Sequence, residues 1–220
     1  MKDLVIFGTG GFAREVHQVA LDLGAEGAGW NVLGFLDGNV ERHGTSVHEL
    51  PVLGDETWLT GRSDVWVVVA IGSTPSKQRV VRALERAGCR RFASLVHPRA
   101  WVGNGVQVGE GTLICAGTLI TTDIRIGRHV ILNLDCTVGH DAELGDYVTV
   151  APSVNISGAV RVGEGCDLGT GSTVIQGIRI GHWSVVGAGA VVVRDLEPNV
   201  TAVGVPAKPI KTRSEGWQLS

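Results

Sequence analysis

A histidine followed by a carboxylate, His140 and Asp141, is the pair of residues in this sequence best suited to acid–base chemistry. An imidazole changes its protonation near neutral pH, so a surface histidine can accept a proton from an attacking amine or hydroxyl group. A neighbouring carboxylate can orient the ring and stabilise the imidazolium that forms. The pair follows a segment, Asn133-Leu134-Asp135, that departs from the pattern around it. We therefore predict that His140 is a general base oriented by Asp141.

A six-residue repeat surrounds this pair. From Val102 to Val192 every sixth residue is Val, Ile or Leu, which is the pattern of a hexapeptide-repeat parallel β-helix. Three hexads form one triangular coil of about 18 residues, and the leading and fifth residues of each hexad are predicted to point inward. Stacked coils pair each strand with the strands above and below it, so the backbone groups are satisfied along each wall. His140 takes the third position of its hexad and is therefore predicted to lie on the outer surface near a corner.

Other histidines have weaker contexts. His129 and His182 lie at outward positions of the repeat without an adjacent carboxylate, and we expect them to be solvated or to lie in an interface. His97, beside Pro98, is expected to shape the connection between the two halves of the chain. The periodicity of the repeat does not by itself exclude a purely structural rod.

The first half of the chain alternates strand and helix signals. Short apolar runs predict strands, and apolar residues at helical spacing predict helices. Expected strands are Leu4 to Phe7, Val32 to Leu36 and Val65 to Ile71, and expected helices begin after Gly11 and run from Lys77 to Ala87. We predict an α/β Rossmann-like domain over residues 1–96, a β-helix over 97–197 and a C-terminal cap or tail over 198–220.

A glycine-rich turn follows the first predicted strand. Gly8-Thr9-Gly10-Gly11-Phe12-Ala13 has the G-x-G-x-x-A form at a strand-to-helix junction, where free amides and the helix dipole favour a phosphate group. Asp37 ends the second predicted strand, where an acidic residue can bond ribose hydroxyls. These features permit NAD binding, but the rest of the chain provides no evident hydride-transfer domain.

Composition narrows the possible partners. The formal net charge is −3 and there is no run of Lys or Arg, so nucleic acid and anionic membranes are not expected partners. The apolar start of the chain is too short for a secretion signal, and we expect no membrane insertion and a cytoplasmic location.

The four cysteines contain no CxxC pair. We expect them to be small core residues rather than disulfides or metal ligands, and we expect no metal site.

Five motifs in order resemble the hexapeptide-repeat sugar acyltransferases, related to sialic acid O-acetyltransferases and to nucleotide-aminosugar N-acetyltransferases such as those for UDP-bacillosamine and GDP-perosamine. The resemblance covers nearly the whole chain. It implies a left-handed parallel β-helix, a threefold homotrimer with active sites between neighbouring rods, and acetyl-CoA as acyl donor. The motifs are Gly8 to Val16, Phe35-Leu36-Asp37, Ala70-Ile71-Gly72, Asn133 to Asp141 and Gly204-Val205-Pro206-Ala207-Lys208.

The resemblance also implies roles for further residues. His140 matches the general base and Asp141 the acidic residue that increases its basicity. Where some relatives carry a second histidine at the thioester, this chain has Thr149, which can donate a hydrogen bond but carries no charge. Other implied CoA contacts are Gly158, Thr170 and Ala188. Implied contacts to a nucleotide-sugar acceptor are Gly10, Gly11, Asp37, Gly72, Ser73 and Lys77, and Lys77 is equally compatible with a solvated helix position.

The sequence and the resemblance are compatible with three functions. The first is transfer of acetyl from acetyl-CoA to the amino group of a nucleotide-linked sugar. The second is O-acetylation of a sugar or sialic acid, for which the same base would serve. The third is a non-catalytic trimeric scaffold or nucleotide-sugar sensor. Trp183 and Trp217 could pack at a trimer contact or over CoA.

Overall fold

A computed structural model describes residues 1–27 and 29–219. The contacts divide the chain into two compact units, one formed by Met1–Gly72 with Ser76–Pro98 and the other by Ser73–Pro75 with Arg99–Ser220.

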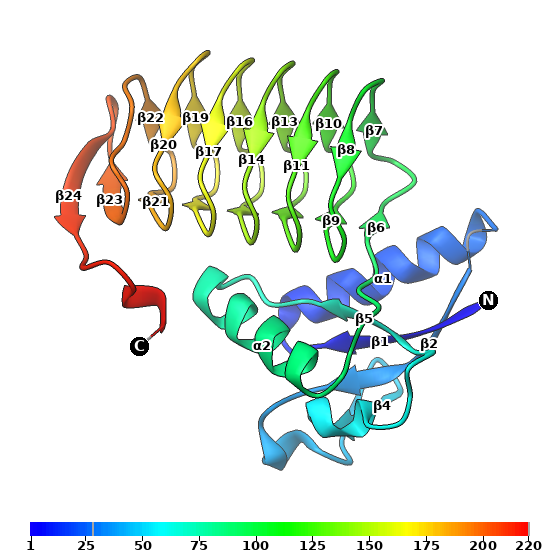
Figure 1. Ribbon diagram of the computed structural model, residues 1–220. Coiled ribbons are helices and arrows are strands. Elements are labelled where there is room, and N and C mark those ends of the chain that lie inside the picture. Colours follow the sequence, from blue (N-terminus) through cyan, green and yellow to red (C-terminus); the bar gives the residue numbers. More distant parts are fainter. Residues whose placement is uncertain (28, 220) are drawn as a thin grey trace. The chain divides into compact units, whose positions relative to one another are not determined.

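The first unit contains a five-stranded sheet in the order β3-β4-β2-β1-β5 (Figure 1). β1, β2, β4 and β5 are parallel to their neighbours, and β3 with β4 forms an antiparallel hairpin. Helix α1 packs on β1 and β2. The elements are β1 (Lys2–Phe7), α1 (Gly11–Ala25), β2 (Trp30–Leu36), β3 (Ser46–Val47), β4 (Leu50–Gly54), β5 (Trp66–Val69), α2 (Thr74–Arg86) and β6 (Leu95–Val96), with short 3-10 turns at Val40–Arg42 and Glu56–Leu59.

Continuous apolar strands form the core of this unit. Val5, Phe35 and Val68, from three neighbouring strands, are fully buried, because parallel strands covered on both faces need apolar side chains throughout. The carboxyl ends of β1, β2 and β5 therefore lie at one edge of the sheet, and this edge carries the glycine-rich turn after β1 and Asp37 after β2.

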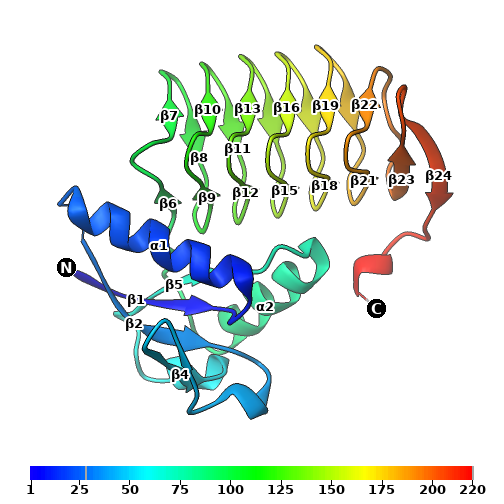
Figure 2. The same ribbon diagram turned by 180° about the vertical axis from the view of Figure 1, so that it is seen from behind.

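The second unit is a parallel β-helix with three walls (Figures 1 and 2). The first wall comprises β7 (Trp101–Val102), β10 (Leu119–Ile120), β13 (Thr137–Val138), β16 (Asn155–Ile156), β19 (Thr173–Val174) and β22 (Val191–Val192). The second wall comprises β8 (Gln107–Val108), β11 (Arg125–Ile126), β14 (Glu143–Leu144), β17 (Arg161–Val162) and β20 (Arg179–Ile180). The third wall includes β9 (Leu113–Ile114), β12 (Ile131–Leu132), β15 (Thr149–Val150), β18 (Asp167–Leu168), β21 (Val185–Val186), β23 (Val200–Val203) and β24 (Lys208–Thr212). A 3-10 turn, Trp217–Leu219, follows.

The inward positions of the hexads are those predicted from the sequence. In the hexad of His140, the leading Val138 and the fifth residue Ala142 are both fully buried. The first coil is the exception, because its leading residue Val102 is 37% exposed. The fourth position takes a left-handed backbone, as at Asp141 with φ of 60°, and Asp is among the non-glycine residues that adopt it most readily.

Polar residues at the fifth position bond across to the next coil. The hydroxyls of Thr112 and Thr118 donate to carbonyl oxygens 15 residues later in the chain, and the thiols of Cys136 and Cys166 do the same at 3.2 and 3.1 Å. Burial raises the pKa of Cys136 to about 11 and that of Cys166 to about 12. All four cysteines are buried as reduced thiols, which confirms their predicted role as core residues.

Candidate active site

The paired side chains of His140 and Asp141 are exposed at the edge between the first and second walls. Nδ1 of His140 lies 2.7 Å from Oδ2 of Asp141, and the two side chains are 55% and 64% exposed. A carboxylate can only accept, so the Nδ1 atom must carry the proton in this hydrogen bond. In the neutral imidazole with this tautomer, Nε2 carries no proton and is the atom able to accept one from a reacting group.

The third hexad positions along this edge define a line of residues that we call the histidine edge. They are Asn104, Thr122, His140, Gly158, Gln176 and Arg194. Two residues before four of these positions stand Val138, Ile156, Val174 and Val192, which are paired in register along the first wall. Consecutive residues of the histidine edge therefore lie in neighbouring coils.

Gly158 lies directly against the imidazole of His140. A Cβ atom added to Gly158 would lie 2.6 Å from Nε2 and 2.7 Å from Cε1 of that ring. Any side chain at this position would displace the ring, so the glycine is required for the observed position of His140. The implied contact between Gly158 and CoA remains a prediction, and the contact with the ring is a second role that spacing did not reveal.

The other implied CoA contacts lie elsewhere on the rod. Thr170 and Ala188 occupy the edge between the third and first walls, where the amide of Gly189 donates to the carbonyl oxygen of Thr170 at 2.8 Å. Thr149 lies within β15 of the third wall and is 7% exposed. Within a single rod these residues are therefore not brought together with His140.

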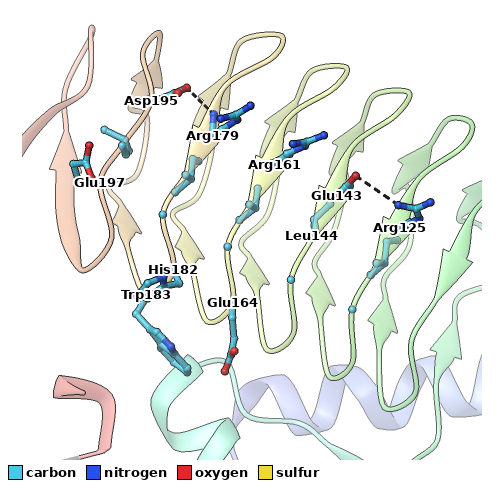
Figure 3. A pocket seen from close by; sticks show the side chains of 18 of the residues that line it. Arg125, Glu143, Leu144, Arg161, Glu164, Arg179, His182, Trp183, Asp195 and Glu197 are labelled. Atoms are coloured by element: carbon cyan, nitrogen blue, oxygen red, sulfur yellow. Dashed lines mark hydrogen bonds and ion pairs between the residues drawn. The ribbon is translucent and has the colours of Figure 1, made fainter. Parts of the chain in front are cut away.

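A groove that the sequence analysis did not predict runs along the second wall (Figure 3). Its volume is about 900 Å³, and its lining includes Arg125, Glu143, Arg161 and Arg179, one from each successive coil. The signal for it is the charged residue at the last position of these hexads, repeated every 18 residues. Only the stacking of coils converts that spacing into one charged surface.

The glycine-rich turn of the first unit is closed on one side and open on the other. Gly8 has φ of 120°, and a Cβ there would lie 3.0 Å from the carbonyl oxygen of Ala70, so glycine is required. Gly10 precedes α1 with no side-chain cap, and a Cβ on it would meet nothing within 4 Å. The hydroxyl of Thr9 donates to Oδ2 of Asp37. The turn and Asp37 are thus brought together, with space beside Gly10.

The remaining residues predicted to contact the nucleotide sugar differ in their exposure. Gly11, Gly72 and Ser73 are exposed. Lys77 is 1% exposed, so the alternative of a solvated helix position is wrong. Its long side chain is enclosed by the fold, where an ammonium group requires a polar partner.

The structure corrects two expectations about aromatic residues of the repeat. His129 is 1% exposed and stacks on Tyr147 of the next coil, with ring centroids 5.5 Å apart, so it is not solvated. Trp183 is 4% exposed and packs over Gly165 of the preceding coil. Its ring fills space within its own rod, where a side chain at position 165 would collide with it.

Three further expectations concern residues outside this pattern. His182 is exposed, as predicted. Nε2 of His97 lies 2.8 Å from Oδ2 of Asp22, within the first unit. Trp217 lies beneath the guanidinium of Arg213, 4.3 Å from its ring centroid. The proposed trimer or CoA contact of Trp217 remains a prediction.

Neither a metal cluster nor a membrane span is found in the described part of the chain. Residues 1–27 and 29–219 contain no group of three or more His, Cys, Asp or Glu placed to hold a metal ion. No helix within these ranges combines the length and apolar character needed to cross a bilayer.

A Rossmann-like unit followed by a hexapeptide-repeat β-helix with an exposed His–Asp pair defines a class of proteins, and known proteins share this architecture. Residues 3–84 match the family model of the PglD N-terminal domain, and residues 159–194 match the hexapeptide repeat of succinyl-transferase. The perosamine N-acetyltransferase of Caulobacter crescentus, solved with CoA and GDP-perosamine, is 36% identical with a TM-score of 0.85, over 96% of this chain and 98% of that one.

A second solved structure is similar over nearly the whole chain. The acetyltransferase domain of PglB from Neisseria gonorrhoeae is 30% identical with a TM-score of 0.84, over 96% of this chain and 100% of that one. The chain therefore belongs to the family of hexapeptide-repeat sugar acetyltransferases with a PglD-type N-terminal domain. The predicted family and the predicted fold class, including the left-handed β-helix, are confirmed.

Curated relatives match over shorter stretches. The galactoside O-acetyltransferase of Lactococcus lactis is 37% identical over 106 residues, which are 46% of this chain and 51% of the relative. The serine acetyltransferase of a Buchnera aphidicola strain is 30% identical over 120 residues, which are 54% of this chain and 41% of the relative. The chain thus spans about half or less of the length of these curated relatives.

Proposed function

We propose that this protein transfers an acetyl group from acetyl-CoA to the amino group of a nucleotide-linked amino sugar, with His140 as general base. The observation that carries the proposal is the geometry of the exposed His–Asp pair. Asp141 binds Nδ1 of His140 at 2.7 Å, so the ring is oriented and, in the neutral imidazole, Nε2 is the atom that accepts a proton. Nε2 has no hydrogen-bond partner among the described residues and is therefore available to a reacting group.

The proposed reaction is a direct attack on the thioester. The amine nitrogen of the sugar forms a bond to the acetyl carbon while Nε2 of His140 accepts the proton of that amine. The bond between the acetyl carbon and the CoA sulfur then breaks, and the proton held by His140 passes to the leaving thiolate. Asp141 stabilises the imidazolium that exists between these two steps.

The acceptor nucleotide is assigned to the glycine-rich turn of the first unit. The open space beside Gly10 and the uncapped start of α1 support the binding of a phosphate group there. Asp37, which is held by the Thr9 hydroxyl, provides a carboxylate for a ribose hydroxyl. Gly11, Gly72, Ser73 and Lys77 complete the proposed set. The relative solved with GDP-perosamine supports a nucleotide-sugar acceptor.

The complete active site is proposed to need a second copy of the chain. His140 and Gly158 lie on one edge of the rod, whereas Thr170 and Ala188 lie on another. Both edges border the first wall, and in a threefold assembly through this wall the histidine edge of one copy would lie next to the Thr170 edge of its neighbour. Exposed apolar residues on that wall, Trp101 and Leu119 among them, support such an interface. We therefore infer a homotrimer.

Turnover is the direct test of the proposed reaction. Wild-type protein is incubated with acetyl-CoA and a panel of nucleotide-linked amino sugars, and released thiol is measured together with the mass of the product. Acetylation of an amine, lost in His140→Ala, is expected. Transfer to a hydroxyl alone would indicate the O-acetyltransferase. Absence of both turnover and CoA binding would contradict the proposal and favour a non-catalytic scaffold.

Mixing two inactive variants tests whether the site is shared between copies. His140→Ala removes the base, and Ala188→Trp is expected to block the Thr170 edge without touching His140. If each site uses edges of two copies, mixed trimers contain some sites free of both changes, and activity reappears on co-refolding. No recovery from trimers shown to be mixed by mass would contradict a shared site. The mass of the native assembly in solution checks the trimer independently.

A further inference from the structure

Three arginines of the repeat have no carboxylate partner among residues 1–27 and 29–219, and all three lie on the same side of His140. Arg125 pairs with Glu143 at 3.7 Å, and Arg128 forms an ion pair with Glu110. In contrast, the guanidinium groups of Arg161, Arg179 and Arg194 make no hydrogen bond or ion pair to any of the described residues, and all three residues are exposed. They occupy successive coils that follow His140 in the chain.

These arginines are grouped beside the histidine edge. Arg194 is a member of that edge, three coils after His140. Arg161 and Arg179 begin the strands of the second wall only three residues after Gly158 and Gln176, and Figure 3 shows them at this end of the groove. Arg161 and Arg179 are direct neighbours in the ladder, where like charges destabilise each other. A bound anion would remove that repulsion.

Glu143 is the neighbour of Arg161 in the ladder, but its carboxylate pairs with Arg125. The other carboxylates near the arginines bond a backbone amide or lie away from this end of the groove. Oδ1 of Asp195 accepts a hydrogen bond from the backbone amide of Arg179 at 2.8 Å. Glu164 also lines the groove, but Figure 3 shows it with Trp183 at the opposite end of these strands. Glu197, the remaining acidic residue of the lining, comes after the last strand of the second wall.

We propose that Arg179 and Arg194 bind the diphosphate of CoA, whose pantetheine arm runs along the histidine edge from His140. This inference rests on the proposed function and identifies residues that recognise the donor. Coils are stacked at about 4.8 Å, so three coils separate His140 from Arg194 by roughly 14 Å. An extended pantetheine arm spans roughly 15 Å by ordinary bond lengths. A thioester at His140 therefore brings the diphosphate to Arg179 and Arg194.

The charges along the edge determine the direction of the arm. At the fourth hexad positions, Asp123 and Asp141 lie in the coil before His140 and in its own coil, and they would repel a phosphate chain running toward the N-terminal coils. The next two fourth positions are Ala159 and Gly177, which carry no charge, and the one after them is Asp195, which lies between the two cationic residues Arg194 and Arg179. Gly158 leaves the surface beside the ring without a side chain. The arm is therefore expected to run toward the C-terminal coils.

Single substitutions of the arginines test the proposal. Loss of a charge-assisted phosphate contact is expected to raise the dissociation constant of CoA about tenfold in Arg179→Ala and in Arg194→Ala. Arg125→Ala is the matched control, since Arg125 lies on the same wall but before His140 and is paired with Glu143. Its CoA affinity should stay within twofold of the wild type. Calorimetry measures binding, and a thermal melt confirms that each variant is folded.

Substrates without phosphate separate this effect from a general loss of activity. The KM for S-acetylpantetheine, which lacks the diphosphate, should be the same in the wild type and the arginine variants, while the KM for acetyl-CoA rises. A nucleotide sugar also carries a diphosphate, so GDP and UDP are titrated as well. Weaker binding of these nucleotides with unchanged CoA affinity would overturn the assignment to CoA.

The failures of the two proposals can be distinguished. If the wild type binds CoA and all three variants bind it equally well, the diphosphate site is wrong and the acetyltransferase proposal stands. If the wild type neither binds CoA nor turns over acetyl-CoA, the proposed function fails and the diphosphate site fails with it.

Discussion

Replacing Gly158 by alanine should lower turnover by moving the imidazole of His140. The added Cβ would lie 2.6 Å from Nε2, whereas ordinary contacts begin near 3.4 Å. The ring must therefore shift by roughly 0.8 Å, and misplacement of a catalytic group by about 1 Å can cost roughly 100-fold in rate. We expect kcat to fall between about 10- and 100-fold, which corresponds to about 1.4 to 2.7 kcal/mol in activation free energy.

A double-mutant cycle isolates this mechanism. Gly158 has no left-handed backbone, so alanine there introduces no backbone strain, and its effect should pass through the His140 ring. In a His140→Ala background there is no ring to displace, and Gly158→Ala should then change the residual kcat less than twofold. Steady-state kinetics on the four proteins measure the cycle, and thermal melts confirm that all are folded.

Two results would refute this reasoning. An unchanged kcat in Gly158→Ala would mean that the ring position is unimportant or readily recovered. An equal loss of kcat in the presence and absence of His140 would mean that Gly158 acts through something else, such as the implied contact with CoA, and a parallel rise in the KM for acetyl-CoA would identify that contact.

Three further predictions follow from the geometry of other residues. Asp141→Asn should lower kcat by about 10- to 100-fold, because Asn no longer fixes the imidazole tautomer. Stability should change little, since Asn tolerates the left-handed backbone. Steady-state kinetics and a thermal melt measure the two effects, and an unchanged kcat would exclude the orienting role. The pKa of His17 is lowered below its usual 6.5, mainly by burial and to a smaller extent by the charge of the neighbouring His48. The unfolded chain therefore binds more protons below pH 6.5, so stability should fall as the pH drops through this range, and His17→Gln should show a shallower fall in melting temperature between pH 7.5 and 5.5. The four buried thiols should react with a thiol reagent at pH 8 only after unfolding, because burial raises the pKa of Cys136 and Cys166 and excludes the reagent; rapid labelling of the native protein would contradict that burial.

The six-residue repeat and the predicted catalytic pair could be read from the sequence because both are local patterns. Aliphatic residues at every sixth position determine the walls and the inward positions, and the position of His140 within its hexad determines its exposure. The continuous apolar strands of the first unit were equally readable, since strands buried on both faces need them. The hairpin of β3 and β4 gave no such signal, because two short strands, one of them interrupted by Pro51, have no recognisable alternation.

The sequence by itself determined the β-helix, the exposed His140–Asp141 pair and the glycine-rich turn with Asp37. Only the tertiary structure decided which residues of different coils meet, because residues 18 apart in the chain become neighbours once the coils stack. That stacking places Gly158 against the His140 ring, buries His129 on Tyr147 and aligns Arg161 with Arg179. It also separates Thr170 and Ala188 from His140 onto another edge, so that one rod alone does not assemble the predicted site.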